Sequence, residues 1–147
     1  MKSRPGTSII EIIIATALIS MAIIAALSLT NHSQKQNNYA RDLAEASRYA
    51  SQAADWIRTE RDRLGWSQLN TVSAGTYCLN SFPASFLSLV TGTCASSTYI
   101  SNTMFQRQIA ITKNDPIDPT AINIVIEVSW LEEILRQAKI EMELTEW

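Results

Sequence analysis

The sequence contains few of the residues from which enzyme active sites are built. It has one histidine, two cysteines and four glycines in 147 residues. No glycine-rich phosphate loop, HExxH, CxxC or Gly-x-Ser-x-Gly motif occurs. A metal role for His32 is disfavoured because no carboxylate or cysteine lies near it in the sequence. We therefore expect a protein that is not an enzyme and that uses no cofactor or metal.

Positive charge is also scarce, and this limits the classes of partner. The formal net charge at pH 7 is −2, and no basic cluster occurs after the first few residues. Binding to nucleic acid depends on clustered Lys and Arg side chains that neutralise phosphates. Nucleic acid is therefore not an expected partner.

What the sequence does contain is a long apolar run near its beginning. From Ile9 to Leu29 the only charged residue is Glu11. As one helix, with a rise of about 1.5 Å per residue, this run is long enough to span a bilayer core of roughly 30 Å. Lys2 and Arg4 precede the run, so the positive-inside rule predicts a cytoplasmic leader and an exported remainder.

Glu11 does not fit a simple membrane anchor. On insertion scales a carboxylate costs about 2.5–3.5 kcal/mol at the centre of a membrane helix, less near an end, and it indicates a functional site with a cationic partner. A plain signal anchor gives Glu11 no role. A secretory signal peptide cleaved at Ala26-Leu27-Ser28 does not explain it either.

The stretch GTSIIEIII, with its basic leader and the apolar helix after it, resembles the class III signal of type IV prepilins and pseudopilins. The resemblance implies cleavage by a prepilin peptidase between Gly6 and Thr7 and N-methylation of Thr7. It also implies that Glu11 pairs with the amino terminus of a neighbouring subunit. An ammonium and a carboxylate in an apolar core are each costly alone and attractive together, so the pair would favour one axial register of packed helices.

The chain departs from the family pattern at two places. Thr7 stands where the family usually has phenylalanine, and Ala15–Thr30 lacks the glycine and proline that many major pilins carry in this helix. These departures favour a minor pilin over a major one.

The resemblance implies a structural subunit of a type IV pilus. Before assembly such a subunit spans the cytoplasmic membrane with its head outside. After assembly it is part of a cell-surface filament. Its partners would be other pilin subunits, the prepilin peptidase and the pilus assembly machinery. One alternative is a pseudopilin of a type II secretion or DNA-uptake machine. Another, of a different class, is a membrane-anchored binding or adhesion module that does not assemble.

Four segments are expected along the chain. They are a leader at 1–6, a transmembrane or filament-core helix at 7–30, an amphipathic continuation of that helix at 31–64, and a β-rich globular head at 65–147. The helix is predicted from about Ser8 to Leu64, because no glycine or proline follows the apolar run before Gly65. Its second half carries a narrow apolar stripe: Leu43, Ala46, Ala50, Ala53, Ile57 and Leu64.

Charged residues near the end of this helix are interpreted as a solvated face. The group comprises Arg58, Glu60, Arg61, Asp62 and Arg63. Tyr49 and Trp56, seven residues apart on one side of the helix, are interpreted as packing residues.

Cys78 and Cys94 bracket a loop of the expected head. In an exported domain two cysteines favour a disulfide, which would stabilise the fold by roughly 3 kcal/mol in the chain-entropy model. Buried free thiols are the alternative. Within the loop, Phe82–Leu89 is a candidate for a short helical turn.

The last third of the chain predicts strands. In Met104–Thr112 three apolar residues share one side, and AINIVIEVSW alternates from Ile122 to Trp130. After Trp130 a helical stripe competes with a strand-like alternation from Ala138 to Leu144, and we favour a hairpin that turns within Leu131–Arg136. A strand ending on Trp130 and a terminal Trp147 also resemble a group of minor pilins. The expected fold class is α+β, a long N-terminal helix packed on a small antiparallel sheet as in the pilin fold.

Overall fold

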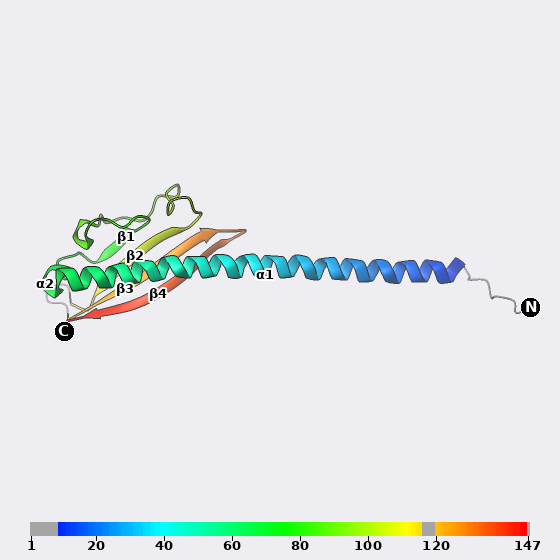
Figure 1. Ribbon diagram of the computed structural model, residues 1–147, viewed down its shortest axis with the longest axis horizontal. Coiled ribbons are helices and arrows are strands. Elements are labelled where there is room, and N and C mark those ends of the chain that lie inside the picture. The colour runs from blue at the N-terminus through cyan, green and yellow to red at the C-terminus, as the bar shows by residue number, and fades with distance from the viewer. Residues whose placement is uncertain (1–8, 116–119, 147) are drawn as a thin grey trace, which may run out of the picture. The chain divides into compact units, whose positions relative to one another are not determined.

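The structure is a computed structural model that describes residues 9–115 and 120–146. It contains helices α1 (Ile9–Leu64) and α2 (Trp66–Leu69) and a short 3-10 helix, η1 (Phe86–Ser88). Four strands complete it: β1 (Gly75–Cys78), β2 (Gln106–Lys113), β3 (Ala121–Leu131) and β4 (Leu135–Thr145) (Figure 1). The described residues divide into two compact units, 9–41 and 42–146, and each is treated by itself below.

Helix α1 runs for 56 residues and contains neither glycine nor proline. It ends at Gly65, whose φ of 74° lies in the left-handed region that glycine adopts most readily. The Gly65 amide donates to the Arg61 carbonyl at 2.9 Å and closes the last turn. The predicted end at Leu64 is confirmed, whereas the predicted start at Ser8 lies outside the described residues.

In the first unit, residues 9–41, three hydroxyl groups of α1 bond to carbonyls of the preceding turn. The Thr16 hydroxyl donates to the Ile13 carbonyl at 3.0 Å, and the Ser20 hydroxyl donates to the Thr16 carbonyl at 2.8 Å. The Thr30 hydroxyl bonds to the Ala26 carbonyl in the same way, at 2.9 Å. These three hydroxyl groups therefore need no water or partner chain, which suits a helix in an apolar environment.

The second unit contains a four-stranded antiparallel sheet in the order β1-β2-β3-β4. Ile109 of β2 pairs with Ile126 of β3, which pairs in turn with Ile140 of β4. The β3–β4 connection is a tight turn between the paired residues Leu131 and Leu135. The hairpin interpretation of this region is thus confirmed, and its helical alternative is wrong.

The core of the second unit lies between the sheet and the last turns of α1. The alternation predicted for the strands is confirmed, because its inward residues are buried: Phe105, Ile109, Ile111, Ile122, Ile124, Ile126, Val128 and Trp130. Alanines of α1 bury their side chains on this sheet, so the helix can lie close to it. The predicted α+β class is confirmed: α1 packs on a small antiparallel sheet.

Aromatic rings pack in and beside the core. Tyr49 lies 5.5 Å from Phe105, and Phe105 lies 5.7 Å from Trp130, measured between ring centroids. Trp56 packs on Phe82 at 5.3 Å and on Phe86 at 5.8 Å. Tyr49 and Trp56 are therefore packing residues, as predicted.

The interpretation of the charged end of α1 as a wholly solvated face is wrong at Glu60. This residue is 5% exposed, whereas Arg58, Asp62 and Arg63 are exposed and Arg61 is half-buried. The physical reason is its position on the packed side of the helix, since Glu60 lies three residues after the buried Ile57 and its carboxylate meets the Phe86 N–H of the loop.

Strand β1 and helix α2 were not predicted from the sequence. Both lie in a segment rich in serine and threonine, and each has four residues. Because β1 buries Tyr77 alone among its residues, it offers no alternation for a pattern to detect. The predicted turn inside the loop is present as η1.

Candidate functional site

Glu11 lies in the first turn of α1 and is exposed. A negative charge at this position is favourable for the helix itself, because the amino end of a helix carries partial positive charge. The carboxylate makes no hydrogen bond or ion pair within the part of the chain that the structure describes. No described residue covers its side chain.

The helix around Glu11 presents apolar side chains on all sides. Ile9 is 78% exposed, and large apolar residues remain uncovered along the whole first unit: Ile9, Ile10, Ile12, Ile13, Ile14, Leu18, Ile19, Met21, Ile23, Ile24, Leu27 and Leu29. By length and composition this part of α1 is able to cross a membrane. So much apolar surface requires lipid or other helices to cover it.

Two of the predicted site residues, Gly6 and Thr7, lie outside the described residues, as do the leader and Trp147. Cleavage between Gly6 and Thr7 and methylation of Thr7 therefore stay predictions. In residues 9–115 and 120–146 no group of three or more His, Cys, Asp or Glu side chains is arranged to hold a metal ion.

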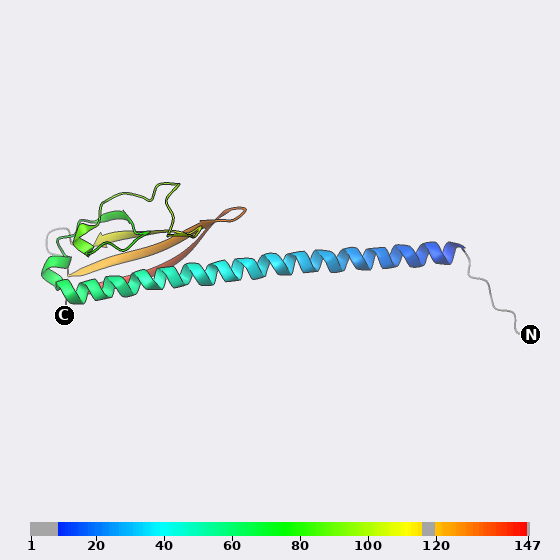
Figure 2. The same ribbon diagram turned by 45° about the horizontal axis from the view of Figure 1, so that its top comes forward.

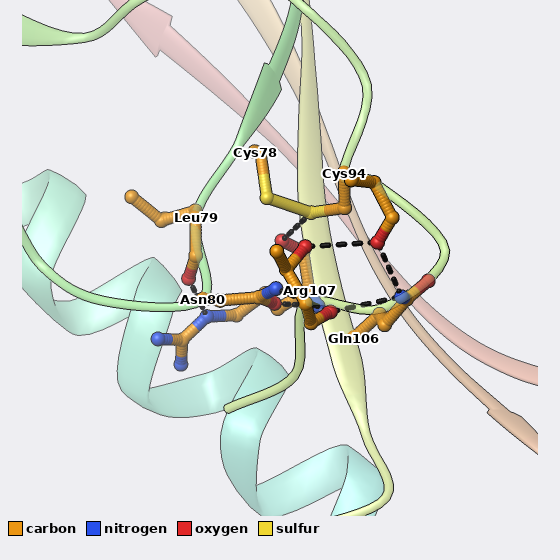
Figure 3. Close-up of a disulfide and its surroundings, with 8 residues drawn as sticks. Cys78, Leu79, Asn80, Cys94, Gln106 and Arg107 are labelled. Atoms are coloured by element: carbon orange, nitrogen blue, oxygen red, sulfur yellow. Dashed lines mark hydrogen bonds between the residues drawn. A yellow bond between two sulfur atoms is a disulfide. The ribbon is translucent and has the colours of Figure 1, made fainter. Parts of the chain in front are cut away.

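The predicted disulfide between Cys78 and Cys94 is present, with Cα atoms 4.7 Å apart and a sequence separation of 16. It joins the end of β1 to the loop that leads toward β2, as Figure 3 shows. The bond closes the segment that carries η1. It therefore restricts the freedom of the whole loop.

Arg107 of β2 lies beside the disulfide and is 2% exposed. Its Nε donates to the Leu79 carbonyl at 2.7 Å, and its Nη1 donates to the Tyr49 carbonyl of α1 at 2.9 Å. The guanidinium carbon lies 4.2 Å from the centre of the Phe82 ring, a cation–π distance. One side chain thus ties the sheet to the helix and to both ends of the segment 79–82.

The Arg107 backbone reinforces this connection. Its N–H donates to the Asn80 side-chain oxygen at 2.7 Å, and its carbonyl accepts from the Leu79 N–H at 2.8 Å. Burial lowers the pKa of Arg107 to about 10, so the side chain remains protonated at neutral pH.

Glu60 anchors the loop at a second point. Its carboxylate accepts two hydrogen bonds from the Arg63 guanidinium, at 2.8 and 2.7 Å. It also accepts one from the backbone N–H of Phe86 at 2.7 Å, at the beginning of η1. Arg63 in turn donates to the Ser85 hydroxyl at 3.0 Å. These bonds attach the loop to the last turns of α1.

Sequence reasoning missed Glu60 and Arg107, although each left a signal. Arg107 occupies the inward position between Phe105 and Ile109, where a strand alternation requires a buried side chain. Glu60 continues the three- and four-residue spacing of the helix stripe. A charged residue at an inward position is a sign of a buried, paired charge.

Comparisons of the chain with protein-family models, with curated proteins and with solved structures found no match.

Proposed function

We propose that this protein is a minor pilin, a subunit of a type IV pilus that is cleaved after Gly6 and assembled through the first half of α1. A pseudopilin of a secretion or DNA-uptake machine would use the same helix and is the nearest alternative.

One observation carries the proposal. A single exposed carboxylate, Glu11, lies at the start of an apolar helix that continues without a break into the core of the second unit. A plain anchor needs the apolar helix but gains nothing from Glu11, which raises the cost of insertion. A packed bundle of identical helices gains from it if each carboxylate meets a cationic amine.

The position of cleavage supplies such an amine. Cutting after Gly6 would create a new amino terminus at Thr7, about one helical turn before Glu11. On a neighbouring helix shifted by that amount, the ammonium would reach the depth of the Glu11 carboxylate. The sequence thus accounts for both charges with one processing step.

Substitution of Glu11 tests the proposal in the bacterium that makes the protein. We expect Glu11→Ala to leave membrane insertion intact and to lower the amount of this protein in sheared filaments by at least about tenfold, because breaking a buried ion pair costs about 3–5 kcal/mol. Immunoblots of the membrane and filament fractions measure both quantities.

Glu45→Ala is the matched control, because Glu45 is an acidic residue on the same helix within the second unit. It should leave the filament fraction unchanged. A membrane-anchored binding module predicts equal behaviour of the two variants, and that result would contradict the proposal.

A further inference from the structure

The segment 79–105, here called the β1–β2 loop, is attached to the rest of the second unit by contacts other than its disulfide. Figures 1 and 2 both show the loop beside the β1 edge of the sheet, on the side away from β4. Arg107 binds its first residues, and Glu60 binds the Phe86 N–H in its middle. Phe86 is 1% exposed, and its ring packs on that of Trp56 in α1. The loop thus has polar and apolar contacts of its own.

Cys78 is the last residue of β1, and strand pairing fixes its backbone. It lies opposite Gln108 of β2. The next residue, Leu79, is fully buried. Its N–H donates to the Arg107 carbonyl at 2.8 Å, and its carbonyl accepts from the Arg107 Nε at 2.7 Å. The position of Cys78 is therefore set by the sheet and not by the bond to Cys94.

Cys94 lies in the loop, and residues on both sides of it are bonded to the sheet. Two residues before it, the Gly92 N–H donates to the Thr76 carbonyl of β1 at 2.8 Å. Directly after it, the Ala95 carbonyl accepts a hydrogen bond of 2.9 Å from the side-chain Nε2 of Gln106 in β2. The backbone of Cys94 is thus held from both directions.

The Gln106 side chain holds a second point of the loop. Its Nε2 also donates to the Thr98 carbonyl at 2.8 Å, and the same carbonyl accepts from the Asn80 Nδ2 at 2.9 Å. Figure 3 shows the Gln106 and Asn80 side chains beside the disulfide. The chain on the far side of Cys94 is therefore fixed by side-chain amides of β2 and of the beginning of the loop.

The sulfur atom of Cys94 also has a polar neighbour. It lies 3.3 Å from the Arg107 carbonyl oxygen. In the reduced protein the Cys94 S–H would donate a weak hydrogen bond to that oxygen. The Cα atom of Cys78 lies only 4.7 Å from that of Cys94, so this bond would keep the thiol close to its partner.

We propose that the fold of the second unit holds Cys78 and Cys94 side by side as thiols, so that the β1–β2 loop folds before its disulfide forms and stays folded when the disulfide is reduced. The inference goes beyond the proposed function and does not depend on it. Two thiols held in contact react as an intramolecular pair with a high effective concentration. The disulfide then locks a loop that other contacts have already shaped.

The oxidation requires a disulfide oxidant of the type RSSR. The thiolate of one cysteine attacks it, forms a mixed disulfide and releases one RSH. The second cysteine attacks the mixed disulfide, which forms the Cys78–Cys94 bond and releases the second RSH. The two protons of the cysteine thiols end on the two RSH molecules, so two protein thiols are oxidised as one oxidant disulfide is reduced.

Hydrogen exchange of the full chain in detergent tests whether the loop folds without the bond. In the double variant Cys78→Ser/Cys94→Ser, we expect peptides that contain Leu79, Phe86 and Gly92 to exchange at least about tenfold more slowly than in the urea-unfolded chain, because their amides remain bonded. Exchange of these peptides at the rate of the unfolded chain would overturn the proposal.

A second experiment measures the coupling between the hydrogen bonds and the disulfide. Because both favour the same folded loop, loss of the hydrogen bonds must lower the equilibrium constant for disulfide formation. We expect Gln106→Ala to lower this constant about tenfold, since it removes two hydrogen bonds around Cys94. The full chain is equilibrated with reduced and oxidised glutathione, and thiol labelling followed by mass spectrometry gives the oxidised fraction.

Gln108→Ala is the matched control. Gln108 is the next outward residue of β2 after Gln106 and is likewise half-buried, but its side chain bonds to none of the described residues of the loop. The equilibrium constant should stay within about twofold of wild type. Equal effects of the two substitutions, or no effect of Gln106→Ala, would overturn the proposal, because the disulfide would then form independently of the contacts around Cys94.

Discussion

Glu60 and Arg107 each bring a charge into the interior of the second unit, and each satisfies it in a different way. Arg107 donates hydrogen bonds to the backbone carbonyls of Leu79 and Tyr49, and the Phe82 ring lies beside its guanidinium group. Glu60 is paired with Arg63 and accepts the Phe86 N–H. Hydrogen bonds from Arg63 lower the pKa of Glu60 from 4.5 to about 2, although burial by itself would raise it.

The pKa of Glu60 predicts how stability depends on pH. Because the folded-state pKa is depressed, the carboxylate contributes stability above pH 4.5, and the contribution disappears as the pH falls toward 2. We expect Glu60→Gln to lower the free energy of unfolding at pH 7 by about 2–3 kcal/mol, since it weakens charged hydrogen bonds. The difference from wild type should shrink to near zero at pH 2.

Urea unfolding of the detergent-solubilised full chain, followed by tryptophan fluorescence, measures this difference at each pH. Asp55→Asn serves as the control, because Asp55 is exposed and pairs with Arg58 on the same helix. Its effect should stay within about 0.5 kcal/mol. A Glu60→Gln effect that does not change with pH would count against the assigned role of the carboxylate.

At the scale of elements, the second half of α1 packs a narrow, alanine-rich face on the sheet. Ala46, Ala50 and Ala53 have no exposed surface, and Ala54 has almost none. Small side chains let the helix axis lie close to the strands, and protein interiors are in general packed tightly. The fit therefore depends on residue size as well as on hydrophobicity.

Enlarging one alanine tests this fit. We expect Ala50→Leu to lower the free energy of unfolding by about 1–3 kcal/mol, because extra methyl groups in a packed interface force the neighbours apart. Ala44→Leu, at an exposed position of the same helix, should change it by less than about 0.5 kcal/mol. The same urea titration compares them, and equal effects would show that the face is not closely packed.

The parts of the fold that were predicted are those with a long, regular pattern. The uninterrupted helix to Leu64, the inward residues of β2 and β3 and the β3–β4 hairpin all follow from periodicity and from the position of glycine. Strand β1 was missed because it has four residues and pairs by register with β2, which local sequence does not encode. Glu60 was misassigned because a charged residue was taken as solvent-facing, although its spacing placed it on the packed side.

At the candidate site, prediction from the sequence depended on single residues and not on a long pattern. The disulfide was predicted because two cysteines in an exported domain are unusual unless they pair. The role of Glu11 stays a prediction.

At the scale of the whole molecule, one feature of the described chain fits the proposed assembly. The first unit leaves a row of large apolar side chains uncovered and places Glu11 among them. Lipid alone would cover the apolar side chains in an isolated anchored module, whereas the proposed filament subunit would also give Glu11 a cationic partner.

The mass of the mature N-terminus tests the central claim most directly. The chain is purified from cells with and without the prepilin peptidase, and its N-terminal peptide is measured by mass spectrometry. The proposal predicts a chain that begins at Thr7, with or without one added methyl group, when the peptidase is present and at Met1 when it is absent. An unprocessed chain in both strains would contradict it.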